Sequence, residues 1–284
     1  MTAYREEGVV FACGDNRLVG VAAIPETTSG VGVLILVGGP QYRVGSHRQF
    51  TLLARRLAES GFASMRFDYT GMGDSEGDPR GFEEIEDDLA AAISVFLETV
   101  PGVKRVVLWG LCDAASSAMM FAHRHSRVTG MILLNPWVHS GDYSPQVKLA
   151  HYYRPSFARK DQWHRLLSGK IKLIPAFREL GRDALALLGI QLPGSSRKSS
   201  SGSFVTAMLD GLLHFRHGVL IVLGEADLTA REFSTMISHD ALWKAAISGP
   251  AIRIRTVKSA DHTFSKKPWK EEVSQLTIDW LQDQ

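Results

Sequence analysis

The sequence predicts an α/β fold in which helices flank a mostly parallel central sheet. Short apolar runs alternate with amphipathic segments through the first half of the chain and again near its end. This β-α-β-α-β order is typical of parallel strands joined by right-handed crossovers. With 284 residues the chain is long enough for one large domain with a full hydrophobic core.

Seven apolar runs have the length and composition of buried strands. They are residues 18–24, 31–37, 63–67, 105–109, 130–135, 218–224 and 252–257. Amphipathic segments between these runs predict helices. They are residues 47–61, 82–100, 114–125, 204–215, 229–237, 240–247 and 268–281. The first of these helices ends at Gly61, which suits a C′ position, and the last begins at Pro268, which suits a first turn.

The alternation of strands and helices breaks between Pro136 and about Phe204. Aromatic, basic and helix-forming residues dominate this stretch, and a low-complexity loop, "LPGSSRKSSSGS", closes it. We therefore expect an α/β core in two parts, residues 1–136 and 207–284. A mainly helical cap, residues 137–206, is inserted between them.

Bulk composition excludes several classes of function. The net charge of +2 and the balance of acidic and basic residues argue against a nucleic-acid partner. No apolar run is long enough for a signal peptide or a membrane span, which predicts a cytoplasmic protein. Two cysteines, Cys13 and Cys112, fit a reducing compartment, although counting alone leaves a disulfide open. No spacing of metal ligands occurs, and no metal or organic cofactor is expected.

The segment "VVLWGLCDAASS", residues 106–117, carries the strongest functional signal. A strand turns into a helix through Gly110, Cys112 and Ala114, with a small residue two positions to either side of the cysteine. Such an elbow presents a nucleophile clear of the sheet, and the dipole of the following helix favours a thiolate. The carboxylate of Asp113 would oppose thiolate formation. The alternative is a structural cysteine in a strand–helix turn.

Two further strand ends supply an acid and a base. Asp227 follows the strand 218–224, and His262 follows the strand 252–257. The chain order of nucleophile, acid and histidine is that of enzymes with a nucleophile elbow. Taken singly, Asp227 is also explained as a helix N-cap and His262 as a solvated loop histidine. All three residues in this order, each after a strand, favour a Cys112–His262–Asp227 catalytic triad.

A glycine-rich loop, "VGGPQYRVGSH", follows the buried strand 31–37 and suits an oxyanion hole. Pro40 has no N–H, so we expect the backbone amides of Gln41 and Asp113 to be the donors. Gly39 in this loop and Trp137 at the start of the cap are candidate substrate-binding residues. A phosphate-binding loop is disfavoured because neither GxGxxG nor GxxxxGK[ST] is present.

These motifs together resemble the α/β-hydrolases. They are "VGGPQ", "RFDYTGMGDSEG", "GLCDAAS", "GEADLT" and "ADHTF". The cysteine elbow together with "VGGPQYRVGSHRQF" also resembles the exosortase A system-associated hydrolases of type 1. These are predicted bacterial enzymes encoded near exopolysaccharide and protein-sorting genes. The departure from the wider superfamily is Cys112 in place of serine, which leaves acyl chemistry plausible but puts simple ester hydrolysis in doubt.

We therefore expect an acyl-transfer enzyme that hydrolyses an ester, thioester or amide through an acyl-cysteine intermediate. The substrate is a small acyl compound, free or bound to a carrier. The aromatic residues of the cap either line an apolar acyl site or pack on the core. Two alternatives stay open: an acyltransferase with an amine or alcohol acceptor, and a catalytically inactive binding protein with the same fold. The residues specify neither the acyl group nor the oligomeric state.

Overall fold

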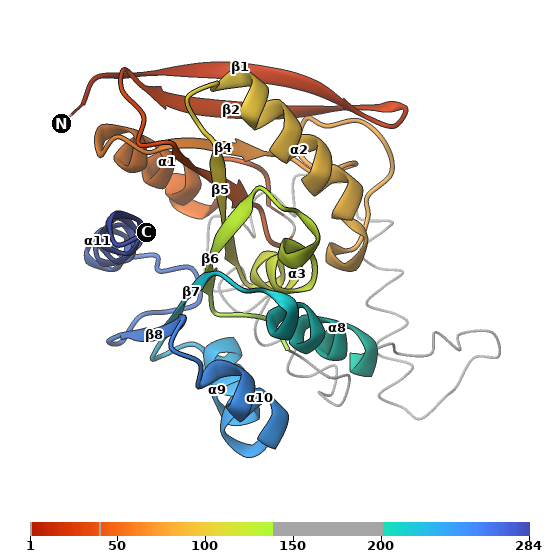
Figure 1. The fold of residues 1–284 in the computed structure, drawn as a ribbon, viewed down its shortest axis with the longest axis vertical. Coiled ribbons are helices and arrows are strands. Elements are labelled where there is room, and N and C mark those ends of the chain that lie inside the picture. The colour runs from red at the N-terminus through yellow and green to blue at the C-terminus, as the bar shows by residue number, and fades with distance from the viewer. Residues whose placement is uncertain (1, 40, 139–200) are drawn as a thin grey trace, which may run out of the picture. The chain divides into compact units, whose positions relative to one another are not determined.

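A computed structural model describes residues 2–39, 41–138 and 201–284 (Figure 1). In these residues eight strands form one sheet in the order β1-β2-β4-β3-β5-β6-β7-β8. The pairs β1–β2 and β2–β4 are antiparallel, and all other neighbours are parallel. The strands are β1 (Tyr4–Cys13), β2 (Asn16–Pro25), β3 (Val31–Leu36), β4 (Ala63–Phe67), β5 (Arg105–Leu111), β6 (Val128–Leu134), β7 (Gly218–Gly224) and β8 (Ile252–Val257). The predicted α/β class with a mostly parallel sheet is confirmed.

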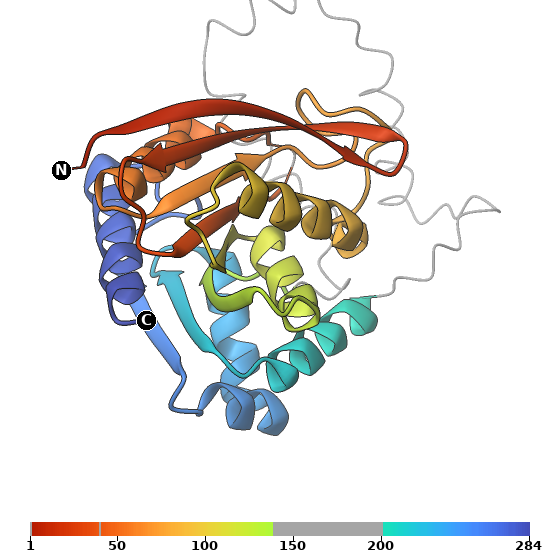
Figure 2. The same ribbon diagram turned by 45° about the horizontal axis from the view of Figure 1, so that its top comes forward.

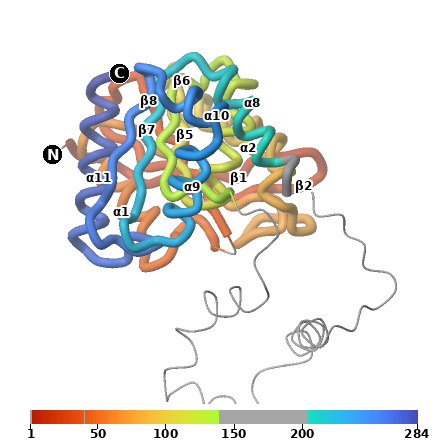
Figure 3. Tube along the Cα trace, turned by 90° about the horizontal axis from the view of Figure 1, so that it is seen from below, coloured from red at the N-terminus to blue at the C-terminus, as the bar shows by residue number. Residues whose placement is uncertain are grey.

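Helices cover both faces of the sheet. They are α1 (Gln49–Glu59), α2 (Glu86–Thr99), α3 (Asp113–Phe121), α8 (Ser201–His214), α9 (Leu228–His239), α10 (Ala241–Ile247) and α11 (Lys267–Gln282), with short 3-10 turns η1 (Ser46–Arg48), η2 (Phe82–Glu84) and η3 (Ala122–Arg124). Helices α1 and α11 lie on one face, and α2, α3 and α8 lie on the other (Figures 1 and 3). Each predicted helix is therefore present. None of the helices in the described part of the chain is both long and apolar enough to cross a bilayer.

Strand β1 is not predicted by the sequence analysis. Its charged residues Arg5, Glu6 and Glu7 are exposed, and only Val9 and Phe11 are buried. The strand lies at the edge of the sheet, where it forms a hairpin with β2 through Gly14, which has a φ of 57° (Figure 2). An edge strand pairs on one side and buries little, so its sequence lacks the apolar run typical of a central strand.

Two strand glycines allow helices to pack closely on opposite faces of the sheet. A Cβ atom on Gly32 of β3 would lie 2.7 Å from the Phe96 ring of α2. A Cβ atom on Gly130 of β6 would lie 2.7 Å from the Trp280 ring of α11. Neither position has room for a side chain, because a large aromatic ring rests directly on the strand backbone. This close packing fixes α2 and α11 against the sheet near the amino ends of β3 and β6.

The predicted cap, residues 137–206, lies mostly outside the described residues, so that it stays a prediction. By its contacts the chain divides into Met1–His139 with Ser203–Gln284, and Ser140–Gly202. Helix α8 begins at Ser201 and runs without a break across the predicted boundary at 206/207. The last three residues of the predicted low-complexity loop are therefore helical. The rest of that loop also lies outside the described residues.

Candidate active site

Cys112 is the single residue between β5 and α3, and its backbone conformation is rare for any residue except glycine. Its φ is 65° and its ψ is −125°. The Cys112 N–H donates to the Leu134 carbonyl at 2.9 Å, and the Cys112 carbonyl accepts from Ala115 N at 3.0 Å. These bonds tie the elbow to the end of β6 and to the first turn of α3. Backbone strain of this kind, held by its surroundings, clusters at functional sites.

Close backbone packing leaves room only for a small residue two positions before Cys112. A Cβ atom on Gly110 would lie 2.7 Å from the backbone carbonyl of Ala114. This contact is too close for any side chain, because the first turn of α3 folds back over the end of β5. The prediction that the neighbours of Cys112 must be small is confirmed at Gly110.

Asp227 and His262 are in direct contact. Asp227 Oδ1 lies 3.0 Å from His262 Nδ1, and the Asp227 carboxylate is buried. The second oxygen, Oδ2, accepts from the Ala230 N–H at 2.9 Å and caps α9. Asp227 is therefore both the cap of α9 and the partner of the histidine. The cap fixes the carboxylate so that its free oxygen points at the imidazole.

His262 interacts with Cys112 as well as with Asp227. Burial lowers the pKa of His262, but hydrogen bonds to Asp227 and Cys112 outweigh it and raise this pKa to about 10. Because Nδ1 faces Asp227, the other ring nitrogen, Nε2, is the one left for the thiol. The structure thus brings together all three side chains that the sequence analysis selected. The interactions with Asp227 and Cys112 favour the charged imidazolium.

Asn135, which the sequence analysis missed, connects three segments of the site. It directly follows β6, is fully buried and has a φ of 43°. Its Nδ2 donates to the His262 carbonyl at 3.0 Å, and its Oδ1 accepts from Gly224 N at 2.8 Å. Asn135 therefore holds the His262 loop against the end of β7. A polar residue directly after a buried strand is the signal that could have identified it.

The glycine-rich loop differs from the expectation in one respect. The Gln41 N–H, expected as an oxyanion donor, donates to the Gly39 carbonyl at 2.8 Å. This bond satisfies the Gln41 amide within the loop, so that it is not directed at Cys112. The Gly39 N–H instead points to the elbow and donates to Asp113 Oδ1 at 2.7 Å. In this arrangement Gly39, and not Gln41, presents the loop amide that lies beside the elbow.

Asp113 interacts with this loop through its carboxylate. Oδ1 accepts from Gly39 N and also from Ala114 N, at 2.9 Å. Burial raises the pKa of Asp113, and it prevails over the hydrogen bonds from Gly39, Ala114 and the Asp113 amide, which lower it. A Cβ atom on Gly38 would lie 2.4 Å from Oδ1, so the carboxylate sits directly on the loop backbone. Glycine is required at position 38, because a Cβ atom there would also lie 2.3 Å from the backbone carbonyl of Leu111.

A buried ion pair anchors the far end of the same loop. Asp68, fully buried after β4, accepts from the Arg43 N–H at 2.6 Å and pairs with the Arg43 guanidinium. The guanidinium also reaches the exposed Asp74 carboxylate at 2.7 Å. Asp68 and Asp74 belong to the "RFDYTGMGDSEG" segment, whose role was not predicted. They hold the loop after β3 to the loop after β4.

The two candidate substrate-binding residues lie at the elbow. Trp137 is half-buried, and its N–H donates to the Cys112 carbonyl at 3.3 Å. Its carbonyl accepts from the Ser116 hydroxyl at 2.6 Å. Gly39 lies against Asp113, the residue after the cysteine. Both positions therefore lie next to Cys112, as a substrate contact requires.

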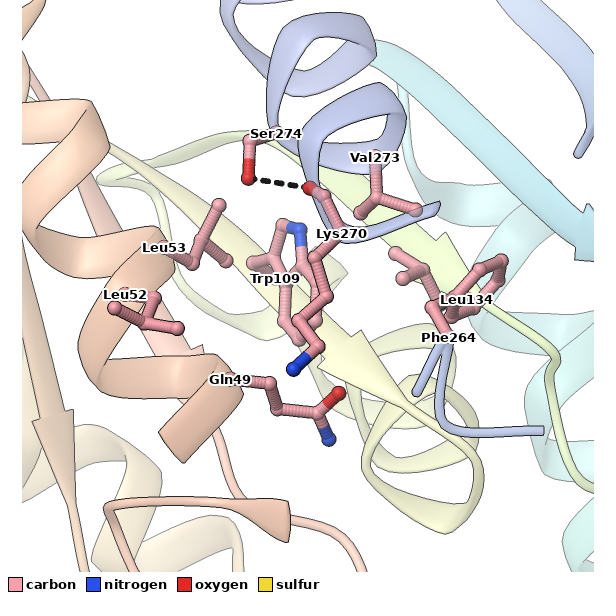
Figure 4. A pocket seen from close by; sticks show the side chains of 9 residues that line it. All are labelled: Gln49, Leu52, Leu53, Trp109, Leu134, Phe264, Lys270, Val273 and Ser274. Carbon is pink, nitrogen blue, oxygen red and sulfur yellow. Dashed lines mark hydrogen bonds between the residues drawn. The ribbon is translucent and has the colours of Figure 1, made fainter. Parts of the chain in front are cut away.

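A small cavity of about 30 Å³ lies between α1, α11 and the end of β6 (Figure 4). It is lined by Gln49, Leu52, Leu53, Trp109, Leu134, Phe264, Lys270, Val273 and Ser274. Figure 4 shows the Lys270 side chain running toward Gln49 across a mostly apolar wall. The volume suits one or two waters, and none of the three candidate catalytic residues lines it. This cavity is therefore not the substrate site.

Metal ligands do not gather in the described part of the chain, where no group of three or more His, Cys, Asp or Glu side chains could hold an ion. The two cysteines, Cys13 and Cys112, are both free thiols. Cys13 donates to Asp88 at 3.1 Å, and burial together with Asp88 raises the pKa of the Cys13 thiol to about 11. The two thiols therefore differ sharply in their surroundings.

A family described as Hydrolase_4, serine aminopeptidase S33, matches residues 32–183, which is more than half of the chain. The chain belongs to this family. It is an α/β-hydrolase, and the resemblance inferred from its motifs is confirmed at this level. The family's description names a serine, whereas the elbow of this chain carries Cys112.

Individual relatives are more distant. The quorum-quenching protein AidA of Acinetobacter baumannii (strain MDR-ZJ06) is 26% identical over 185 residues, which are 62% of this chain and 59% of that protein. The chain thus matches less than two thirds of that relative's length. The Pyrococcus furiosus esterase Pf2001 superimposes with a TM-score of 0.63 at 14% identity, over 99% of this chain and 93% of that one.

A second solved structure gives the same result. Est1E of Butyrivibrio proteoclasticus, solved with ferulic acid bound, has a TM-score of 0.61 at 16% identity and covers 97% of this chain and 98% of its own. At such low identity these structures establish the α/β-hydrolase fold. They identify neither the nucleophile nor the substrate of this chain.

Proposed function

We propose that this protein is an acyl hydrolase that works through a thioester on Cys112. The observation that carries the proposal is the contact of His262 with both Asp227 and Cys112, at an elbow whose backbone is strained. A structural cysteine needs neither a charged imidazole partner nor a left-handed backbone. A nucleophile uses both, because the first favours the thiolate and the second lifts the sulfur clear of the sheet.

The first half of the reaction forms the thioester. The Cys112 thiolate attacks the carbonyl carbon, a C–S bond forms, and the carbonyl electron pair moves onto oxygen. When the C=O bond forms again, the leaving group departs and takes a proton from His262 Nε2. Asp227 orients the imidazole through Nδ1 and stabilises its charged form without itself accepting the proton.

The second half of the reaction hydrolyses the thioester and regenerates the free enzyme. Water gives a proton to His262 and attacks the thioester carbon, and the C–S bond breaks to release the acid and the thiolate. The developing oxyanion in both halves requires two backbone donors. We assign these to the N–H groups of Asp113 and Gly39, since the Gln41 N–H is bonded within its own loop. Loss of one such donor typically costs about 2.7–4 kcal/mol of transition-state stabilisation.

The substrate in this proposal is a small acyl compound, free or carrier-bound. Trp137, whose backbone contacts the elbow, would contact the acyl group. The amino-acid sequences of the elbow and of the "VGGPQYRVGSHRQF" loop support the narrower assignment to the exosortase A system-associated hydrolases of type 1, acting in the cytoplasm. Acyl transfer to an amine is a second outcome that the cysteine favours, because a thioester is more reactive toward amines than an oxyester is.

Substitution of the nucleophile tests the proposal. Cys112→Ser should keep the fold and part of the activity toward activated esters, but lose most transfer to an added amine such as hydroxylamine. Cys112→Ala should lose both, whereas Cys13→Ala, the matched control, should keep both. The free acid from hydrolysis and the hydroxamate from transfer are measured side by side for wild type and the three variants. Full turnover by Cys112→Ala would reduce Cys112 to a packing residue and rule out the thioester mechanism, whereas no turnover by any of the four proteins would favour a binding protein with a hydrolase fold.

A further inference from the structure

The Asp113 carboxylate lies where an oxyanion is expected to bind. In an elbow enzyme the two donors are the amide of the residue after the nucleophile and an amide of the loop after the third strand. Here the residue after the nucleophile is Asp113 itself. The loop amide at the elbow is that of Gly39, which already donates to Asp113 Oδ1 at 2.7 Å.

The contacts of this oxygen resemble those of a bound oxyanion. The same atom, Oδ1, accepts a second bond from Ala114 N in the first turn of α3, where the helix dipole favours negative charge. Oδ1 packs against the loop backbone at Gly38, where a Cβ atom would lie 2.4 Å from it and 2.3 Å from the Leu111 carbonyl. A carboxylate oxygen between two backbone amides at a helix N-terminus has the charge and size of the reaction's oxyanion, and it takes one of that oxyanion's two donors, the Gly39 N–H.

From these contacts, and resting on the function proposed above, we propose that the Asp113 carboxylate is a built-in occupant of the oxyanion hole. The substrate's carbonyl oxygen has to displace it before Cys112 can attack. Asp113 is then a specificity-determining residue. Small esters that bind through little beyond their carbonyl displace it poorly, and substrates held by further contacts displace it well.

An alternative role for the same carboxylate is to position the Gly39 loop. The two roles predict opposite effects of removing it. If Oδ1 occupies the hole, removal frees the Gly39 N–H for the substrate and accelerates acylation. If Oδ1 holds the loop in its working position, removal lets the loop move and slows acylation. The backbone amide of Asp113 stays in place in either case.

The experiment compares wild type with Asp113→Ala and Asp113→Asn. Both variants remove the charge that opposes the thiolate, but only alanine removes the oxygen from the Gly39 N–H. Acylation by p-nitrophenyl acetate is followed at the Cys112 peptide by mass spectrometry. Alkylation by iodoacetamide is followed at the same peptide as a control, because this reaction forms no oxyanion. Thermal unfolding checks that each variant is folded.

Occupancy predicts that Asp113→Ala is acylated about tenfold faster than Asp113→Asn, equivalent to about 1.4 kcal/mol, while the two are alkylated at the same rate. Equal acylation of the two variants, or slower acylation of Asp113→Ala, would overturn the inference and leave the proposed function standing. Alkylation of Cys112 in all three proteins without acylation of any would overturn the proposed function itself, and the inference with it.

Discussion

Asn135 Nδ2 donates to the His262 carbonyl at 3.0 Å, across 127 positions of the chain. The bond joins the end of β6 to the loop that carries the proposed base. Because the other atom of the amide, Oδ1, is held by Gly224 N at 2.8 Å, Asn135 cannot turn without losing both contacts. The position of His262 relative to Cys112 therefore depends on a residue that takes no part in the chemistry.

Asn135→Asp tests this positioning role. Aspartate keeps the size, tolerates the left-handed backbone and still accepts from Gly224 N, but it cannot donate to the His262 carbonyl. We expect kcat to fall about tenfold with little change in KM, because the base moves while the binding surface stays. We also expect the free energy of unfolding to fall by about 1–3 kcal/mol. Steady-state kinetics and urea denaturation measure the two effects. An unchanged kcat in the destabilised variant would leave Asn135 a purely structural residue.

His262→Ala and Asp227→Asn separate the base from its partner. His262→Ala should remain folded but lose acylation of Cys112 at neutral pH, and raising the pH should restore part of it as hydroxide ionises the thiol. Asp227→Asn should be slowed less severely. Asparagine caps a helix about as well as aspartate, so the stability of Asp227→Asn should stay close to wild type.

Rates of Cys112 acetylation and thermal unfolding curves check this pair of variants. Wild-type acetylation of His262→Ala at neutral pH would remove His262 from the mechanism. Because asparagine keeps the helix cap, a large loss of stability in Asp227→Asn would mean that the charged contact of Asp227 with His262 also stabilises the fold.

The rate of reaction with alkyl esters should fall as the pH rises through about 10. The pKa of His262 is raised to about 10 by Asp227 and Cys112, so the imidazolium is present below that pH and lost above it. A departing alkoxide takes this proton, whereas p-nitrophenolate and the iodide of iodoacetamide leave without one. Only the alkyl ester should slow down above pH 10 once alkaline hydrolysis is subtracted. A decline centred near pH 6.5, the ordinary value for histidine, would show that the imidazolium is not stabilised.

Asp68→Asn should destabilise the protein far more than Asp74→Asn, although both carboxylates contact Arg43. The Asp68 side chain is 0% exposed and that of Asp74 is 64% exposed. Breaking a buried pair leaves the partner's charge uncompensated and costs about 3–5 kcal/mol, while an exposed pair contributes about 1 kcal/mol or less. Urea denaturation of the two variants measures this difference. Equal losses of stability would mean that Arg43 gains no more from the buried carboxylate than from the exposed one.

The parts of the fold that bury apolar surface could be predicted from the sequence. Burial imposes a continuous apolar run on the central strands and a helical period on the amphipathic helices. Strand β1 could not be predicted, since an edge strand with exposed Arg5, Glu6 and Glu7 has no such apolar run. Cys112, Asp227 and His262 were found because each follows a predicted strand.

The residues that support the site left a weaker signal. The contacts of Asn135 with His262 and of Asp113 with Gly39 join positions far apart in the chain, and only the register of the sheet decides them. The prediction of Gln41 as oxyanion donor meets a related difficulty. It depends on which amide in a glycine-rich loop is bonded within the loop, as the Gln41 N–H is to the Gly39 carbonyl, and a hydrogen bond of this kind has no sequence pattern.

The most direct test of the central claim is to trap the covalent intermediate. The protein is mixed with p-nitrophenyl acetate at neutral pH, quenched in acid and digested, and both cysteine peptides are examined by mass spectrometry. We predict one acetyl group on Cys112 that disappears with time as water resolves the thioester. Cys13 should stay unmodified, because its raised pKa of about 11 keeps it a thiol. Release of p-nitrophenolate with no acetyl group on Cys112 at any time, or acetylation of Cys13 alone, would contradict the account.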